Sequence, residues 1–221
     1  MSHDDFEFEP IRGLPAMLPA GERLLWQGNP DWKSLAVRAY HVRKVALYFS
    51  ALVLWRIGVG IKNAHSPSAI AVSCAFLLTL GGIAIGVLSL LAYLGSRATV
   101  YSITSRRVLL RHGVAVPMTL NVPFKVIETA QLRMFADATG DIALGVISSQ
   151  RIGYLITWPH LRPGFVTRPQ PSLRALPDAG RAAEILGLAL AADAGVAAQR
   201  IDANVPPPIA TGLRPRTAAV A

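Results

Sequence analysis

The stretch from Ile70 to Leu94, IAVSCAFLLTLGGIAIGVLSLLAYL, is predominantly apolar and contains no charged residue. At about 1.5 Å per residue, a helix of this length can cross a hydrocarbon core of roughly 30 Å with some allowance for tilt. The stretch lies far from the start of the chain, so we do not interpret it as a cleaved signal peptide. We predict a transmembrane helix over residues 69–95.

A second apolar segment precedes it, over residues 45–61, and contains Arg56. A charge at the centre of a membrane helix costs about 2.5–3.5 kcal/mol, but Arg56 lies close enough to the far end to extend toward water. Its guanidinium either does so or contacts a partner within the membrane, and the sequence favours neither. The short connection, which includes Pro67, predicts an antiparallel hairpin of two transmembrane helices.

Basic residues flank this hairpin on both sides, whereas its loop carries only Lys62 and His65. The positive-inside rule then predicts a multi-pass membrane protein with both termini in the cytoplasm and the loop outside. The 221-residue chain has a formal net charge of +9, but its Lys and Arg residues are scattered. This distribution predicts contact with anionic lipid headgroups and argues against nucleic-acid binding.

The segments before the hairpin carry weaker signals. Residues 1–20 are acidic and then rich in Pro and Gly, which predicts a flexible arm. Residues 21–44 form a juxtamembrane segment in which the short apolar run around Leu25 is either a lone strand or a membrane contact. Trp26 and Trp32 are placed where interfacial anchors occur.

From residue 98 the pattern changes to the period of two that is typical of half-buried strands. The predicted strands cover residues 99–104, 107–113, 114–122, 142–146 and 152–158. A proline-rich connector over residues 159–177 leads to a helix over residues 178–191, and residues 193–221 are predicted to be disordered. The fold class is therefore an α+β membrane protein, with a helical hairpin followed by an antiparallel half-barrel closed by a C-terminal helix over residues 98–192.

Motifs for catalysis or metal binding are absent from the sequence. The histidines are dispersed, the single Cys74 lies in the apolar stretch, and no GxSxG, P-loop or HExxH pattern occurs. We therefore expect no enzyme, no metal and no cofactor. In the second helix, Gly82 and Gly86 have the GxxxG spacing that allows close helix approach, either within the hairpin, which we favour, or with an outside helix.

The block ATVYSITSRRVLLRHG, which follows the hairpin, resembles the pleckstrin-homology-like (PH-like) domain of small bacterial membrane proteins. The hallmark of that family, Y-x-I-T-x-x-R, is matched by Tyr101, Ile103, Thr104 and Arg107. The segment GERLLWQGNP, Gly21–Pro30, resembles the one that precedes the helices in the same proteins. The resemblance implies a membrane-tethered domain that presents sheet edges and loops to proteins or lipids.

A narrower resemblance covers residues 14–192. The stretches LLWQGNPDWKSLAVRAYHVRKVALYF and RPQPSLRALPDAGRAAEILGLAL are similar to PuhB-type photosynthetic complex assembly proteins of purple bacteria. This resemblance implies a non-enzymatic factor of the intracytoplasmic membrane, with reaction-centre and light-harvesting 1 subunits as partners. It carries over no catalytic residues and leaves open a third membrane crossing and homo-oligomerisation.

Two site hypotheses follow. We expect Arg106, Arg107 and Arg111 to face the membrane or a partner. The alternative to an assembly factor is a lipid- or pigment-handling module, which would need a pocket in the sheet domain lined by residues such as Phe124 and Tyr154.

Overall fold

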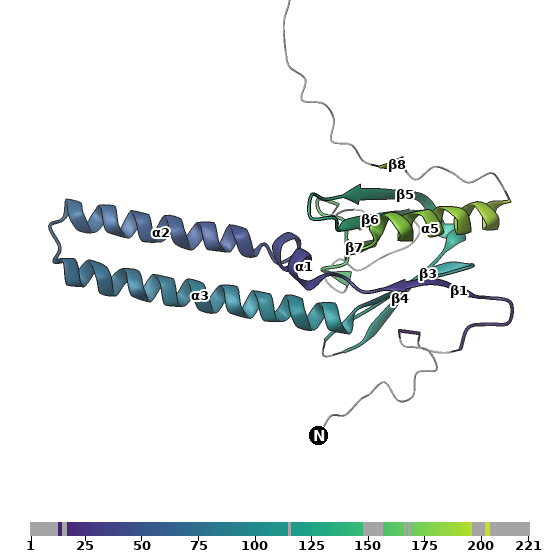
Figure 1. Ribbon diagram of the computed structural model, residues 1–221, viewed down its shortest axis with the longest axis horizontal. Coiled ribbons are helices and arrows are strands. Elements are labelled where there is room, and N and C mark those ends of the chain that lie inside the picture. The colour runs from purple at the N-terminus through teal and green to yellow at the C-terminus, as the bar shows by residue number, and fades with distance from the viewer. Residues whose placement is uncertain are drawn as a thin grey trace, which may run out of the picture.

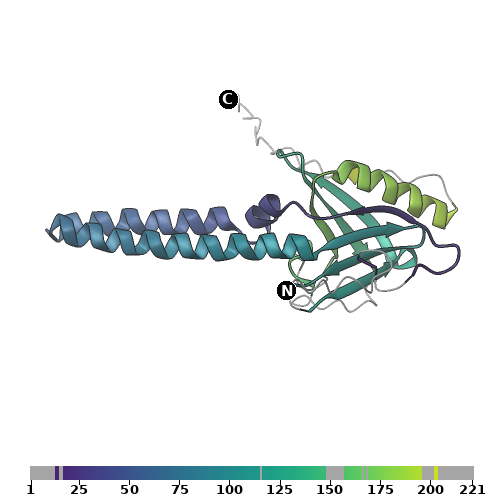
Figure 2. The same ribbon diagram turned by 60° about the horizontal axis from the view of Figure 1, so that its bottom comes forward.

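The computed structural model describes residues 13–14, 17–114, 116–147, 157–165, 167, 169–195 and 202–203. Two long helices project side by side from a domain of strands and one further helix (Figures 1 and 2). The elements, in order, are β1 (Leu24–Gly28), α1 (Trp32–Arg38), α2 (Val42–Lys62), α3 (Pro67–Ala98), β2 (Val100–Thr104), β3 (Arg107–His112), β4 (Met118–Pro123), the 3-10 helix η1 (Phe124–Val126), β5 (Ile127–Met134), β6 (Gly140–Val146), β7 (Ser172–Leu176), α5 (Ala179–Ala194) and β8 (Asp202–Ala203).

The strands form two four-stranded sheets, in the orders β1-β2-β3-β4 and β7-β6-β5-β8. Every pairing is antiparallel except that of β8 with β5. The faces of the two sheets and one side of α5 share a core that includes Tyr101, Ile103, Leu144 and Leu186. The fold class that the sequence predicted, a helical hairpin followed by an antiparallel PH-like domain with a C-terminal helix, is confirmed.

The hairpin is inserted between two paired strands. β1 pairs with β2, with Gly28 opposite Tyr101, although α1, α2 and α3 all lie between these two strands in the sequence. The predicted division, with a juxtamembrane segment over residues 21–44 and a domain beginning at residue 98, therefore needs correction, because β1 is an edge strand of the sheet domain. Both ends of the hairpin are thus attached to neighbouring strands.

Helices α2 and α3 are each long and apolar enough to cross a membrane. Only 6% of the most apolar window of each helix is buried, so most of these side chains face outward. A core helix of a soluble protein would bury such residues. The two helices pack against each other, and Arg56 donates a hydrogen bond to Ser73 Oγ across the hairpin at 3.0 Å.

The glycine contact within the hairpin differs from the predicted one. A Cβ at Gly82 or Gly86 would meet open space, whereas a Cβ at Gly81 would overlap the ring of Phe49. Since successive residues of a helix are turned by about 100°, Gly82 points away from the face that Gly81 presents to α2. The prediction that Gly82 and Gly86 pack the two helices together is therefore wrong. Gly81 makes a close contact with Phe49 of α2 instead.

Substitution of Gly81 by isoleucine is expected to force α2 and α3 apart, because the added side chain occupies the volume of Phe49. The matched change Gly82→Ile is expected to leave the pairing intact. Unfolding of the full chain by titration with SDS in mixed micelles measures the difference. Equal sensitivity of the two variants would contradict this packing.

Several predicted boundaries also change. Strand β4 begins at Met118 and not at residue 114, because Pro117 has no N–H for the ladder and Gly113 turns the chain with φ +114°. The predicted connector contains β7, and within the predicted arm Leu14 is buried. Of the predicted strand over residues 152–158, residues 152–156 lie outside the described residues. In the predicted tail, residues 202–203 form β8.

Candidate functional site at the base of the helical hairpin

The short helix α1 joins the hairpin to the sheet domain. Its N-cap is Asp31, whose Oδ1 accepts a hydrogen bond from Ser34 N at 2.7 Å, and whose own N–H donates to the Ala175 carbonyl in β7 at 2.7 Å. On the inner side of α1, Leu35 is fully buried in a small cluster with Ala39 and Ala175. α1 also contacts α3 and, less extensively, α2. The cap and the buried leucine therefore hold the hairpin against the domain.

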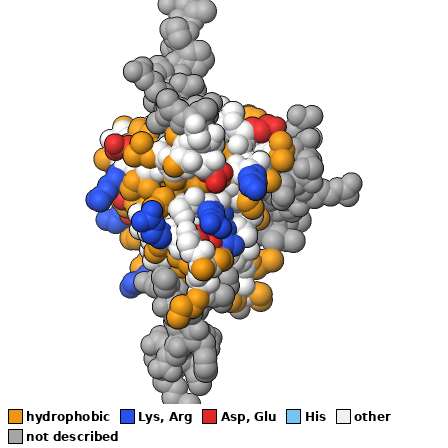
Figure 3. All heavy atoms as spheres, turned by 90° about the vertical axis from the view of Figure 1, so that its right-hand side faces the viewer, with side chains coloured by type: hydrophobic (Ala, Val, Ile, Leu, Met, Phe, Trp, Pro, Cys, Tyr) orange, Lys and Arg blue, Asp and Glu red, His pale blue; other side chains and the backbone are white. Residues whose placement is uncertain are grey.

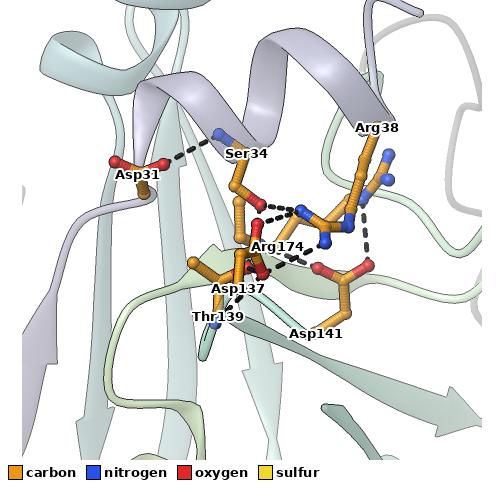
Figure 4. A network of polar contacts seen from close by, with 8 residues as sticks. Asp31, Ser34, Arg38, Asp137, Thr139, Asp141 and Arg174 are labelled. Atoms are coloured by element: carbon orange, nitrogen blue, oxygen red, sulfur yellow. Dashed lines mark hydrogen bonds and ion pairs between the residues drawn. The ribbon is translucent and has the colours of Figure 1, made fainter. Parts of the chain in front are cut away.

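A polar network extends from α1 to the β5–β6 turn (Figure 4). The guanidinium of Arg38 donates to both carboxylate oxygens of Asp137, at 2.8 and 3.1 Å, and lies over the ring of Phe135. Ser34 Oγ and Thr139 Oγ1 are 2.9 Å apart, and Thr139 also donates to Asp137 at 2.7 Å. The bidentate pair fixes the orientation of α1 as well as its distance from the turn.

Hydrogen bonds from Arg38 lower the pKa of Asp137 to about 2 against the opposing effect of burial, and hydrogen bonds from Thr139 add to the lowering. Because this pKa is below that of an unfolded aspartate, the contribution to stability is complete above about pH 4 and is lost as the pH falls toward 2. Asp137→Asn is therefore expected to lower the Tm at pH 7. At pH 3 the difference in Tm between this variant and the unaltered chain is expected to be smaller. Asp193→Asn, on an exposed carboxylate of α5, is the matched control. A pH-independent gap for Asp137→Asn would contradict this assignment.

A second ion pair lies deeper in the same region (Figure 4). The carboxylate of Asp141 accepts a hydrogen bond from the N–H of Ala175 at 2.7 Å and lies 3.5 Å from Nε of Arg174. Nη1 of Arg174 donates to the Pro159 carbonyl at 3.2 Å. Both side chains are largely buried, so this pair joins β6, β7 and the segment before β7. The sequence analysis assigned no function to either residue.

A cleft of about 740 Å³ opens between α1 and the β5–β6 turn. Its lining includes Lys33, Arg38 and Arg43 from the hairpin side and Asp137 from the turn. Arg38 is committed to Asp137, so Lys33 and Arg43 supply the positive charge of this cleft. Such a surface can accept an acidic side chain or a lipid phosphate.

Aromatic side chains surround the same junction. Trp32 packs edge-to-face on Tyr93 of α3, with ring centroids 6.0 Å apart, and Tyr40 packs in the same way on Trp158 at 5.2 Å. The guanidinium of Arg97 donates to Tyr93 Oη. Tryptophan and tyrosine beside basic residues, at the end of an apolar helix, have the composition of a membrane–water interface.

A buried polar cluster lies just beyond the end of α3. Thr99 Oγ1 donates to the Gly95 carbonyl at 2.7 Å, so it accepts the Nε2–H of His160 at 3.2 Å. Nδ1 of the neutral His160 ring then accepts the Tyr101 hydroxyl at 2.6 Å, and Tyr101 Oη accepts from Arg174 N at 3.2 Å. Burial, with smaller effects of His112 and Arg174, lowers the pKa of His160 well below its usual value. Burial also lowers the pKa of His112, whose ring centroid is 5.1 Å away.

The two tryptophans predicted at the membrane interface have different environments. Trp32 is 37% exposed at the base of the hairpin, as an interfacial residue would be. Trp26 is in the core of the sheet domain, and its Nε1 donates to Asp178 Oδ2 at 3.0 Å. Interfacial placement of Trp26 is therefore wrong, because its strand is part of the sheet and turns the indole inward.

The three arginines predicted to face the membrane or a partner do not lie together. β2 starts where α3 ends, so the β2–β3 turn with Arg106 is at the end of the domain opposite the hairpin. Arg107 lies there too and makes a bidentate pair with Glu22 at 2.8 and 2.9 Å. Arg111 is at the other end of β3, opposite Val100. Arg106 and Arg107 are therefore too far from the hairpin to contact a membrane that α2 and α3 would cross, whereas contact of these arginines and of Arg111 with a partner stays a prediction.

Figure 3 shows the face of the domain opposite the hairpin. Its Lys and Arg side chains form separate groups, with acidic side chains among them, so this face has no continuous basic patch. Of the residues predicted to line a pocket in the sheet domain, Phe124 is 4% exposed and packs within the core, and Tyr154 lies outside the described residues. Among the residues that the structure describes, no group of three or more His, Cys, Asp or Glu side chains could hold a metal ion.

Comparison with known proteins agrees with this architecture. Residues 48–189, more than half of the chain, match the bacterial PH domain family. The chain therefore belongs to the bacterial PH domain family. It is also 38% identical over 187 residues to an uncharacterised 23.7 kDa protein in the puhA 5′ region of Rhodobacter capsulatus, covering 84% of this chain and 87% of that protein. No solved structure matches the chain.

Proposed function

We propose that this chain is anchored in a bacterial inner membrane by the α2–α3 hairpin and carries its PH domain at the cytoplasmic surface. The exposed apolar sides of both helices support a lipid environment. Trp32 and Tyr93, with Arg97, would lie at headgroup level. Basic residues flank the hairpin on the domain side, so both termini would be cytoplasmic.

In this membrane we propose a non-enzymatic assembly factor of the PuhB type, for the photosynthetic reaction centre and the light-harvesting 1 complex. The observation that carries this proposal is the gene position of the Rhodobacter capsulatus relative, beside the reaction-centre gene puhA. The fold supports an interaction role, since bacterial PH domains present sheet edges and loops, and β4 is an edge strand of the first sheet. An edge strand can pair with a strand of a partner.

The test is affinity capture of the tagged full chain from pigmented membranes, followed by absorption spectra and protein identification of the eluate. Reaction-centre or light-harvesting 1 polypeptides are expected in the eluate. Asp31→Ala with Leu35→Ala, which releases the hold of α1 on the domain, should reduce their recovery if the domain must be positioned by the hairpin. Recovery of the chain without these polypeptides would contradict the assembly role.

A lipid- or pigment-handling module is the second candidate. It is favoured by one observation, the cleft at the base of the hairpin with Lys33 and Arg43 in its lining, beside the aromatic side chains of the junction. Bound lipid or pigment in the eluate, without antenna or reaction-centre subunits, would favour this module over the assembly factor.

A further inference from the structure

The loop between β3 and β4, residues 113–117, lies on the hairpin side of the domain. β3 runs back toward α3, since its last residues pair with the first residues of β2, which follow α3 directly. Both ribbon views place the joined ends of β3 and β4 next to the C-terminal end of α3 (Figures 1 and 2). The loop is therefore at the end of the sheet that faces the proposed membrane.

The side chains of this loop are apolar and exposed. Its sequence is Gly-Val-Ala-Val-Pro, and β4 then starts with Met118. Val114 is 56% exposed, Val116 69% and Met118 41%. Single exposed apolar side chains are common, but three within five residues at the tip of a sheet are typical of an interaction site.

The base of this loop is a close turn on a regular ladder. Gly113 has a φ of +114°, and a Cβ there would overlap the carbonyl of Val116, so the chain folds back closely on the glycine. The strands on either side are paired from Arg107 with Pro123 to His112 with Met118. Because the loop is short and its base is a regular ladder, the two valines are presented without a large cost of ordering on contact.

The level of the loop matches the proposed membrane surface. From Arg111, which pairs with Val100, to Val114 the strand direction carries the chain up to about 10 Å back toward the hairpin. Along α3, about 10 Å corresponds to six or seven residues, which counts back from Thr99 to about Tyr93. Tyr93 packs on Trp32 beside the end of the charge-free stretch. The valines are thus expected at the depth where headgroups give way to acyl chains.

We propose that the β3–β4 loop is a third membrane contact, inserting Val114, Val116 and Met118 into the lipid surface beside the hairpin. It rests on the proposed insertion of α2 and α3. The occupant is lipid because the apolar loop continues the apolar surface of the hairpin at the same end of the domain, next to the basic Arg111 and Arg97. Three contacts that are not collinear fix the tilt of the sheet domain, so its β4 edge and its cleft have a defined direction relative to the membrane.

The test uses the full chain in the Cys74→Ser background, so that a single introduced cysteine carries an environment-sensitive fluorophore. The labelled positions are Val116 in the loop, Ile83 in the exposed middle of α3, and Lys125 in η1 at the opposite end of the domain. Each protein is reconstituted in vesicles of phosphatidylcholine and phosphatidylglycerol. Quenching is measured with lipids that carry a nitroxide at a shallow or a deep position, and with aqueous iodide. A second loop position, Val114, is labelled in a separate variant to repeat the measurement made at Val116.

The fluorophore at Val116 is expected to be blue-shifted, quenched severalfold by the shallow nitroxide lipid and shielded from iodide. The one at Ile83 is expected to respond to the deep nitroxide and the one at Lys125 to iodide alone. If Val116 behaves like Lys125 while Ile83 is in lipid, the loop proposal is overturned and the hairpin stands. If the fluorophore at Ile83 is in water, the proposed insertion of the hairpin and the proposed loop contact are both overturned. Shielding of Val116 from iodide without lipid quenching would indicate contact with a second copy and would also overturn the loop proposal.

Discussion

Replacement of Trp26 by alanine is expected to lower the free energy of unfolding of the sheet domain by about 3–5 kcal/mol. The indole is 8% exposed in the main core, and its ring lies over Gly28, where a Cβ would overlap it. Its Nε1–H bond to Asp178 also joins β1 to the start of α5. The variant loses both the packing and this bond. Near-UV circular dichroism during urea unfolding of the detergent-solubilised chain measures the change.

Two matched variants separate these contributions. Trp26→Phe keeps most of the apolar contact and removes the hydrogen bond, with an expected loss of about 1–2 kcal/mol including the smaller ring. Trp32→Ala is expected to change the stability of the domain little, since Trp32 is 37% exposed and packs on Tyr93 of the hairpin. A Trp32→Ala variant as unstable as Trp26→Ala would show that the two indoles have similar roles, against the structure.

Acidification below about pH 6.5 is expected to destabilise the domain through His160, by up to about 1.4 kcal/mol per pH unit. His160 is buried and its Nδ1 accepts the Tyr101 hydroxyl, so a proton there would break that bond beside Arg174 and His112. The pKa of His160 is lower in the folded chain than in the unfolded one. The unfolded state therefore binds more protons than the folded state below pH 6.5, and the free energy of unfolding decreases as the pH is lowered in that range.

Substitution of His160 by glutamine removes this titration. The expected result is a lower stability at pH 7.5 but a shallower fall between pH 7.5 and 5.5, with the remaining slope contributed in part by His112. His65→Gln, in the exposed loop of the hairpin, is the control and is expected to leave the slope unchanged. An unchanged slope in His160→Gln would contradict the assignment of the neutral, Nε2-protonated ring.

The parts of the fold that the sequence predicted are those set by local pattern. The charge-free run from Ile70 to Leu94 lies within α3, and the alternation of residues 99–104 and 107–113 agrees with β2 and β3. The pairing of β1 with β2 is not local, because a hairpin of two long helices separates the strands. The residues Leu24–Gly28 carry no periodicity from which the burial of the Trp26 indole beside the start of α5 could be predicted. From the sequence, Trp26 is therefore expected at the membrane interface.

The candidate site was largely missed for the same reason. Arg38 and Asp137 are 99 residues apart, and Ser34 and Thr139 are 105 apart, so only the fold brings them together. The one sequence signal is a glycine turn flanked by Asp137 and Asp141, and turn chemistry is the favoured explanation of aspartates at such positions. The strict alternation of apolar residues from Val114 to Val122 predicts a strand through Pro117, but β4 begins only at Met118.

The central claim is that the hairpin holds the PH domain where photosynthetic complexes assemble. It is tested most directly by near-infrared absorption of membranes from a host strain that lacks the gene, complemented either with the full chain or with a chain in which a flexible linker replaces residues 42–98. We expect loss of reaction-centre and light-harvesting 1 absorption in the deletion strain, recovery with the full chain, and no recovery with the linker version at equal protein level. Unchanged absorption in the deletion strain, or full recovery with the linker version, would contradict it.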